Sequence, residues 1–129
     1  MRLLASPTLV AAVALTACGH APANKHGNSP ATVMNGHLVG PNQMTLYVFD
    51  RDMVNSGKSV CNAGCATNWP PLMAPAGAQP MGDWRVVMRD DGSHQWAYQG
   101  KPLYYWAKDG KPGDATGDGV GNAWRIARP

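Results

Sequence analysis

The chain has 129 residues and a formal net charge of +3, with eleven lysines and arginines and eight acidic residues that are all aspartates. Its basic residues form no stripe, so the composition gives no support for nucleic-acid binding. Fifteen glycines and eleven prolines interrupt short apolar runs, which favours strands and turns over helices.

The N-terminus has the layout of a secretory signal. One arginine precedes a short apolar run, and the sequence Leu15-Thr16-Ala17-Cys18 that ends it resembles a bacterial lipobox. The resemblance implies removal of residues 1–17 and a diacylglycerol thioether on Cys18, hence a membrane anchor. In a Gram-negative cell, Gly19 instead of Asp after the cysteine would favour the outer membrane. The alternative is an ordinary signal peptide with a chance cysteine.

Residues 18–35 are small, polar and proline-containing, which predicts a flexible tether behind the anchor. Residues 36–129 then form one small domain. We expect two halves in it, about 36–80 and 81–129, because a motif recurs 57 positions apart.

The recurring motif is Leu-Tyr-x-aromatic-x-x-Asp, and in each half it predicts a short strand. Both faces of these strands carry bulky side chains, which suits a sandwich or a barrel. The aspartate that ends each motif is placed to accept hydrogen bonds from backbone N–H groups of the following turn, a structural role. The motif residues are Tyr47, Phe49 and Asp52 in the first half, and Tyr104, Trp106 and Asp109 in the second.

A disulfide is predicted between Cys61 and Cys65. Lipid uses Cys18, so these two thiols remain as a pair in an oxidising compartment, and a separation of four on a helical turn is within disulfide reach. Three residues between them do not fit a thioredoxin-type redox pair, and Ala66 stands where covalent haem attachment needs histidine.

The segment Asn68-Trp69-Pro70-Pro71 predicts an extended stretch that lays Trp69 across the sheet, followed by a loop over 74–82. We expect the tryptophans to form the core first and a ligand platform second. They are Trp69, Trp84, Trp96, Trp106 and Trp124.

In the second half, strands over 84–88 and 95–98 flank a turn in which Gly92 takes the left-handed conformation. Further strands are predicted over 102–107 and 123–127. The fold class is therefore all-β, a small antiparallel sandwich or barrel built from two sequence-related halves.

Metal binding and catalysis have weak signals. Asp114, Thr116 and Asp118 match calcium-loop spacing, but Arg125 stands at the position of the bidentate glutamate, so an Asp-Gly turn is the preferred interpretation. Six dispersed methionines with His37 and His94 leave copper binding as an alternative function. No metal site, cofactor or catalytic group is predicted, because the folded part has two histidines and no glutamate.

Several motifs together resemble a family of bacterial secreted-repeat lipoproteins of unknown function that carry a Y-x-[FWY]-x-x-D motif. The resemblance implies a lipid-anchored envelope protein and supplies no activity. The function predicted is a non-catalytic binding or structural module, with an envelope protein or a glycan as possible ligand. The residues that carry the resemblance are the two motifs, Cys61-x-x-x-Cys65-Ala-x-Asn68-Trp69-Pro70-Pro71, Asp90-Asp91-Gly92 and Gln95-Trp96-Ala97-Tyr98-x-Gly100-Lys101-Pro102.

Overall fold

The computed structural model describes residues 11–12 and 29–129 of the chain. The predicted signal peptide, Cys18 and most of the predicted tether therefore lie outside the described residues. Within those described ranges, no helix is long and apolar enough to cross a membrane.

Short strands make up most of the regular structure. The first half contains β1 (Thr32–Met34), β2 (His37–Val39), β3 (Tyr47–Phe49) and the short helix α1 (Gly64–Asn68). The second half contains β4 (Trp84–Met88), β5 (His94–Tyr98), β6 (Lys101–Pro102), the 3-10 turn η1 (Val120–Asn122) and β7 (Trp124–Ile126).

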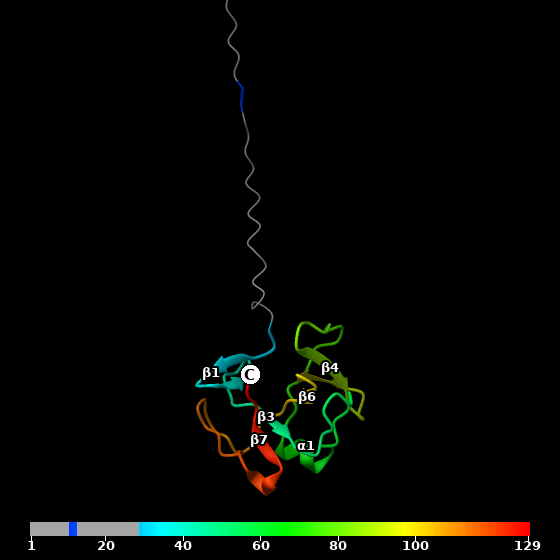
Figure 1. Cartoon of the computed structure of the whole chain (residues 1–129), viewed down its shortest axis with the longest axis vertical. Coiled ribbons are helices and arrows are strands. Elements are labelled where there is room, and N and C mark those ends of the chain that lie inside the picture. The colour runs from blue at the N-terminus through cyan, green and yellow to red at the C-terminus, as the bar shows by residue number, and fades with distance from the viewer. Residues whose placement is uncertain (1–10, 13–28) are drawn as a thin grey trace, which may run out of the picture.

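All strand pairs are antiparallel and fall into three small sheets across residues 29–129, β1-β2, β3-β7 and β4-β5-β6. Strands β3 and β7 run side by side in the middle of the domain, between β1 and the β4-β5-β6 sheet (Figure 1). The antiparallel all-β prediction is confirmed. The sheets do not close into a barrel, because only isolated bridges connect them.

The β4-β5 hairpin is as predicted from the sequence, with a register from Trp84 opposite Tyr98 to Met88 opposite His94. Gly92 has a φ of 86°, and the N–H of Arg89 donates to the carbonyl of Ser93 at 2.8 Å. Glycine adopts this left-handed conformation without steric cost, which explains why the turn forms here.

The folded domain begins before residue 36, so the predicted tether is too long. Strand β1 lies inside the segment assigned to it and pairs with β2, and Ala31 is buried. Asn35 and Gly36 have φ values of 53° and 83° and provide the two left-handed residues that a tight hairpin needs. An Asn-Gly pair between apolar residues is the signal that would have identified this hairpin.

The strand predicted over 102–107 is shorter in the structure, where β6 covers Lys101–Pro102. The segment after β6 still runs beside residues 68–72: the N–H of Tyr105 donates to the carbonyl of Pro70 at 2.7 Å. Pro70 and Pro71 lack a backbone N–H and cannot donate to the segment after β6. The hydrogen-bond ladder is therefore incomplete, and no regular strand forms.

The C-terminal segment of each half pairs with the other half. In the first half, three residues form a closed ring of backbone hydrogen bonds, in which each N–H donates to the carbonyl of the next residue. Leu46 donates to Leu38 at 3.0 Å, Leu38 to Ala127 at 2.9 Å, and Ala127 to Leu46 at 2.8 Å. Ala127 comes from the end of the second half. The first half is therefore completed by the second.

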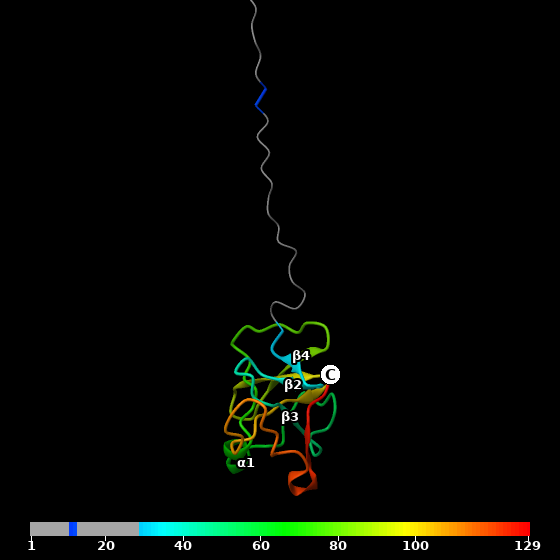
Figure 2. The same ribbon diagram turned by 90° about the vertical axis from the view of Figure 1, so that its left-hand side faces the viewer.

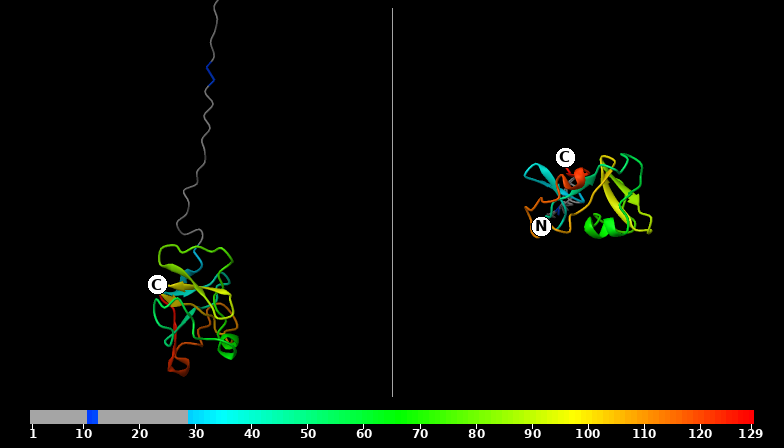
Figure 3. Two further views of the ribbon diagram at one scale, coloured as in Figure 1. Left: turned by 90° about the vertical axis from the view of Figure 1, so that its right-hand side faces the viewer. Right: turned by 90° about the horizontal axis from the view of Figure 1, so that it is seen from below.

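The same ring recurs on the other side. Leu103 donates to Trp96 at 3.0 Å, Trp96 to Leu72 at 2.8 Å, and Leu72 to Leu103 at 2.9 Å, and Leu72 comes from the end of the first half. The halves are thus related by an approximate two-fold axis. Their short helices, α1 and η1, accordingly lie at the same end of the domain, which is the lower end in Figure 2 and in the left view of Figure 3.

Two cores lie on opposite faces of the two motif segments. Leu46 and Leu103 belong to the core that contains Trp84 and Trp96. Tyr47 and Tyr104 belong to the other, whose further members are Cys61, Trp69, Ala123 and Trp124. Bulky residues on both faces therefore reflect burial on both faces, as expected from the sequence.

Candidate functional site

The two motif tyrosines meet at the centre of the domain. The N–H of Tyr47 donates to the carbonyl of Tyr104 at 2.7 Å, and the N–H of Tyr104 donates to the carbonyl of Tyr47 at 2.9 Å. Both residues are fully buried. The approximate two-fold axis therefore passes between these two residues.

Each tyrosine also bonds the aspartate of the opposite motif. The hydroxyl of Tyr47 donates to Asp109 Oδ2 at 2.6 Å, and the hydroxyl of Tyr104 donates to Asp52 Oδ2. Both aspartates are buried. We call these four residues the tyrosine–aspartate lock, because each motif completes its hydrogen bonds only with the other.

The second oxygen of each aspartate holds a loop. Asp109 Oδ1 accepts from the N–H and hydroxyl of Thr116 at 2.9 and 2.7 Å, and Asp52 Oδ1 accepts from the N–H of Val60 at 2.8 Å. These donors lie seven and eight positions beyond the aspartates, not in the next turn as the sequence suggested. The carboxylates point inward, so only the returning end of each loop reaches them.

A buried arginine network adjoins Asp52, and sequence reasoning missed it. Arg89 is 5% exposed, and its guanidinium donates to Ser59 Oγ at 3.0 Å, Gln95 Oε1 at 2.8 Å and the carbonyl of Cys61 at 2.6 Å. Ser59 Oγ lies 2.7 Å from the Tyr104 hydroxyl. Strand alternation was the available signal, because Arg89 lies two positions after buried Val87, directly beyond the end of β4.

Burial shifts the pKa values of Asp52, Tyr47 and Tyr104. Desolvation raises the pKa of Asp52 above its ordinary value of 3.8, while hydrogen bonds from Tyr104 and Val60 and the charge of Arg89 lower it in part. Burial also raises the pKa of Tyr47 and of Tyr104, and the aspartate partners add to the effect. The phenols therefore remain protonated and act as donors.

The raised pKa of Asp52 predicts a pH dependence of stability. A carboxyl that binds its proton more tightly in the folded state loses stabilising effect as pH rises from 3.8 through the raised pKa. We expect the stability of the wild type, relative to Asp52→Asn, to fall across that window. Urea unfolding of both proteins from pH 3.5 upward measures this change. A free energy of unfolding that rises for the wild type relative to Asp52→Asn as pH increases would contradict the assignment.

A four-ring aromatic stack crosses the two-fold axis. Trp69 and Trp124 stack at the centre with ring centroids 3.7 Å apart and planes 3° apart. Trp106 stacks on Trp69 at 3.9 Å, and Phe49 stacks on Trp124 at 4.2 Å. The rings alternate between the two halves, so the stack joins them. Gly117 makes room for it, because a Cβ there would lie 2.9 Å from Trp69.

A solvent-exposed tryptophan platform is not present. Four of the five tryptophans are at most 8% exposed, and the fifth, Trp106, is half-buried at the end of the stack. The ligand-platform expectation is therefore wrong for these four rings, while their core role is as predicted. Pairing across the two halves removes them from solvent.

The predicted disulfide is present. Cys61 and Cys65 are bonded, with Cα atoms 5.2 Å apart. Helix α1 begins at Gly64, so Cys65 alone lies on it, and the single helical turn expected to carry both cysteines is not formed. Fully buried Cys61 and half-buried Cys65 join the core that holds Trp69.

Four of the six methionines in the folded part lie outside the core. Met53, Met73, Met81 and Met88 are exposed, by 39 to 75%. The β4-β5 register places Met88 directly opposite His94. Among the described residues no group of three or more His, Cys or Asp side chains could hold a metal ion. Copper binding through methionine and histidine stays a prediction.

The loop that resembles a calcium site uses its carboxylates locally. Asp114 Oδ2 accepts from the N–H of Gly110 at 2.9 Å, and Asp118 Oδ1 accepts from the N–H of Ile126 at 3.1 Å. The Gly110 N–H and the Lys111 side chain lower the pKa of Asp114. Asp114 therefore serves its turn, in line with the preferred interpretation, whereas Asp118 connects the loop to β7.

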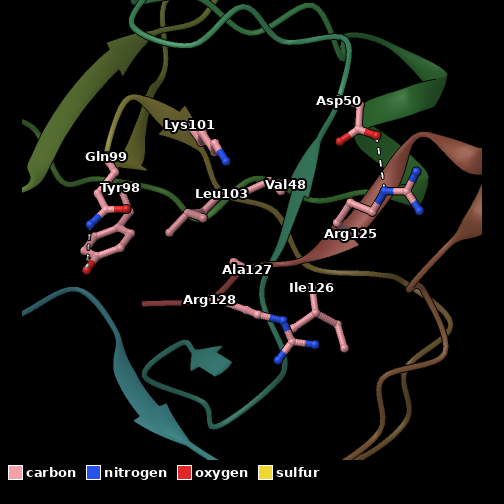
Figure 4. A pocket seen from close by; sticks show the side chains of 10 residues that line it. All are labelled: Val48, Asp50, Tyr98, Gln99, Lys101, Leu103, Arg125, Ile126, Ala127 and Arg128. Carbon is pink, nitrogen blue, oxygen red and sulfur yellow. Dashed lines mark hydrogen bonds and ion pairs between the residues drawn. The ribbon is translucent and has the colours of Figure 1, made fainter. Parts of the chain in front are cut away.

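A groove between the halves was not foreseen from the sequence. It has a volume of about 240 Å³ and lies between β5-β6 on one side and β3-β7 on the other. Lys101 and Arg128 stand on opposite sides of Leu103 and Ala127 (Figure 4). The lining residues, which we call the basic groove, are Val48, Asp50, Tyr98, Gln99, Lys101, Leu103, Arg125, Ile126, Ala127 and Arg128.

A family model described as a secreted repeat of unknown function matches the chain twice, at residues 31–73 and 85–128. Each matched segment contains one copy of the motif. No curated protein and no solved structure matches the chain.

Proposed function

This protein belongs to the family of secreted repeats of unknown function, and from that premise we propose that it is a lipid-anchored, non-catalytic binding or structural module of the cell envelope. The family description indicates an extracellular or envelope location. The finer elements, which are the anchor, the outer membrane in a Gram-negative cell and the absence of catalysis, are our proposal.

The tyrosine–aspartate lock carries the proposal of a non-catalytic module. Acidic and phenolic groups are the side chains of this motif most suited to acid–base chemistry, and here they are buried and bonded to each other. Groups that satisfy one another inside the core stabilise the fold. The motif therefore builds a scaffold, and binding falls to the surface that the scaffold presents.

The anchor is supported by the sequence Leu15-Thr16-Ala17-Cys18 and by the buried disulfide. Cys61 and Cys65 are bonded to each other, which leaves Cys18 as the cysteine available for lipid. A single acyl anchor binds membranes reversibly, whereas a lipoprotein anchor with several chains holds firmly.

Replacing Cys18 with alanine is expected to release the protein from membranes into the soluble fraction, because the thioether is the membrane attachment. Fractionation of cells that express each variant, with metabolic labelling by a fatty acid, measures this. The matched control is the double variant Cys61→Ala with Cys65→Ala, which removes the other cysteines and should remain labelled. Membrane retention and labelling of Cys18→Ala would refute the anchor.

A further inference from the structure

The basic groove is asymmetric, although the fold around it repeats. The spacing of the motifs relates Val48 to Tyr105, because both follow the motif tyrosine. At the position related to the groove, the Tyr105 ring lies directly against Gly40. A Cβ on Gly40 would collide with the Tyr105 hydroxyl. On the Val48 side, the smaller side chain leaves the groove open, and the Tyr98 ring leans onto Trp84 with centroids 4.9 Å apart.

The positive charges of the groove are likewise confined to one side. Each cation corresponds to an uncharged residue in the other half. The spacing of the motifs gives the counterpart of Lys101, and the spacing between Trp69 and Trp124 gives the counterparts of Arg125 and Arg128. The counterpart of Lys101 is Met44, that of Arg125 is Pro70, and that of Arg128 is Met73. The same fold thus forms on the related side without any cation at these positions, so packing does not require them.

The cations extend from ordered backbone. Lys101 is paired with Tyr98 in the β5-β6 ladder, and Ala127, which precedes Arg128, takes part in the hydrogen-bonded ring of the first half. Both Lys101 and Arg128 are exposed. Across the described ranges neither forms a salt bridge. Their charges are consequently accessible from the groove.

The groove also contains one carboxylate, and it is already paired. Arg125 Nε donates to Asp50 Oδ2 at 3.2 Å (Figure 4), and the same guanidinium donates to Asn122 Oδ1 at 3.2 Å. Three cations and one anion give the lining a net charge of +2. With Asp50 compensated by Arg125, the uncompensated charge belongs to Lys101 and Arg128.

We infer that the basic groove binds a phosphate group. The Lys101 ammonium and the Arg128 guanidinium, which stand on opposite sides of Leu103 and Ala127, offer several N–H donors to an oxyanion with several acceptor oxygens. A charge of +2 matches a phosphate monoester better than a carboxylate. The phosphate comes from a lipid headgroup or from a soluble phosphate. Because the site is open to solvent, binding is weak and decreases with ionic strength.

This inference rests on the proposed binding role and gives it a ligand class. It does not depend on the anchor, which the Cys18 experiment tests separately. A groove that bound no phosphate would leave the anchored scaffold intact, so the two proposals fail independently.

The test uses the full-length chain with Cys18→Ala, purified from the soluble fraction. Inorganic phosphate is titrated at constant ionic strength and followed by amide NMR shifts, with acetate as the singly charged comparison. In a second arm, sedimentation measures binding to phosphatidylcholine vesicles with and without phosphatidic acid. We expect phosphate to perturb groove amides at concentrations about tenfold below those of acetate.

The decisive variant carries Lys101→Met and Arg128→Met. Methionine is the residue at both related positions, Met44 and Met73. It should weaken phosphate or vesicle binding by about tenfold or more. The control, Lys58→Gln with Lys108→Gln, removes two exposed charges outside the groove and should bind like the parent. Binding of free phosphate identifies a soluble ligand, and vesicle binding alone identifies a headgroup. No binding in either arm, equal binding of acetate, or equal loss in both double variants would overturn the inference.

Discussion

Replacing Asp52 with alanine is expected to lower the free energy of unfolding by about 3 kcal/mol, in the range found when one partner of a buried charged network is removed. The change deprives the Tyr104 hydroxyl of an acceptor and leaves the Val60 N–H without its bond. It also leaves Arg89 buried without the nearby negative charge. Urea unfolding at neutral pH, with identical slopes for both proteins, measures the difference.

Two comparisons make this prediction specific. Asp109→Ala should cost about 1–3 kcal/mol, because it removes the same kind of bonds without the arginine network. Asp50→Ala removes a neighbouring carboxylate that is exposed and, among the described residues, forms an ion pair with Arg125 alone, so it should cost under about 1 kcal/mol. Unchanged unfolding of Asp52→Ala would refute a structural role.

A rival interpretation makes Asp52 and Asp109 ligands of a shared ion. It predicts normal melting of both variants without ions and a loss of stabilisation when calcium or copper is added. Melting curves recorded with and without these ions separate the two interpretations. The structure favours the first, because each carboxylate already accepts bonds on both oxygens.

Replacing Trp69 with alanine is expected to destabilise the protein by about 3–5 kcal/mol, the range for deleting a large aromatic side chain from a core. Trp69 lies inside the four-ring stack, so Trp106 and Trp124 both lose a stacking partner and Tyr47 loses an edge contact. Thermal unfolding measures the loss, and near-ultraviolet circular dichroism reports the change in the stack.

Trp106→Ala is the matched control for the position of the ring. Trp106 ends the stack, is half-buried and contacts Trp69 on one face, so its removal should cost about 1–2 kcal/mol. Equal losses for the two variants would show that the central rings do not join the halves. Non-additive effects of Trp69→Ala and Trp124→Ala would support direct coupling between them.

The sequence alone determined the local features of this protein. The runs at 84–88 and 95–98 with Gly92 between them predicted a hairpin, and two cysteines four apart predicted a disulfide. The doubled motif predicted two related halves, and bulky residues on both faces of its strands predicted double burial. These features depend on neighbours a few positions away, so the local pattern contains the information needed to infer them.

Only the tertiary structure decided how the halves combine. Nothing in the spacing of the motif shows that Tyr47 bonds Asp109 instead of its own Asp52, because the partners are 62 positions apart. The basic groove likewise joins Lys101 and Arg128 across the interface, and it stays open because Val48 is smaller than its counterpart Tyr105. The physical reason is the pairing of each C-terminal segment with the opposite half, which brings distant side chains together that no local pattern relates.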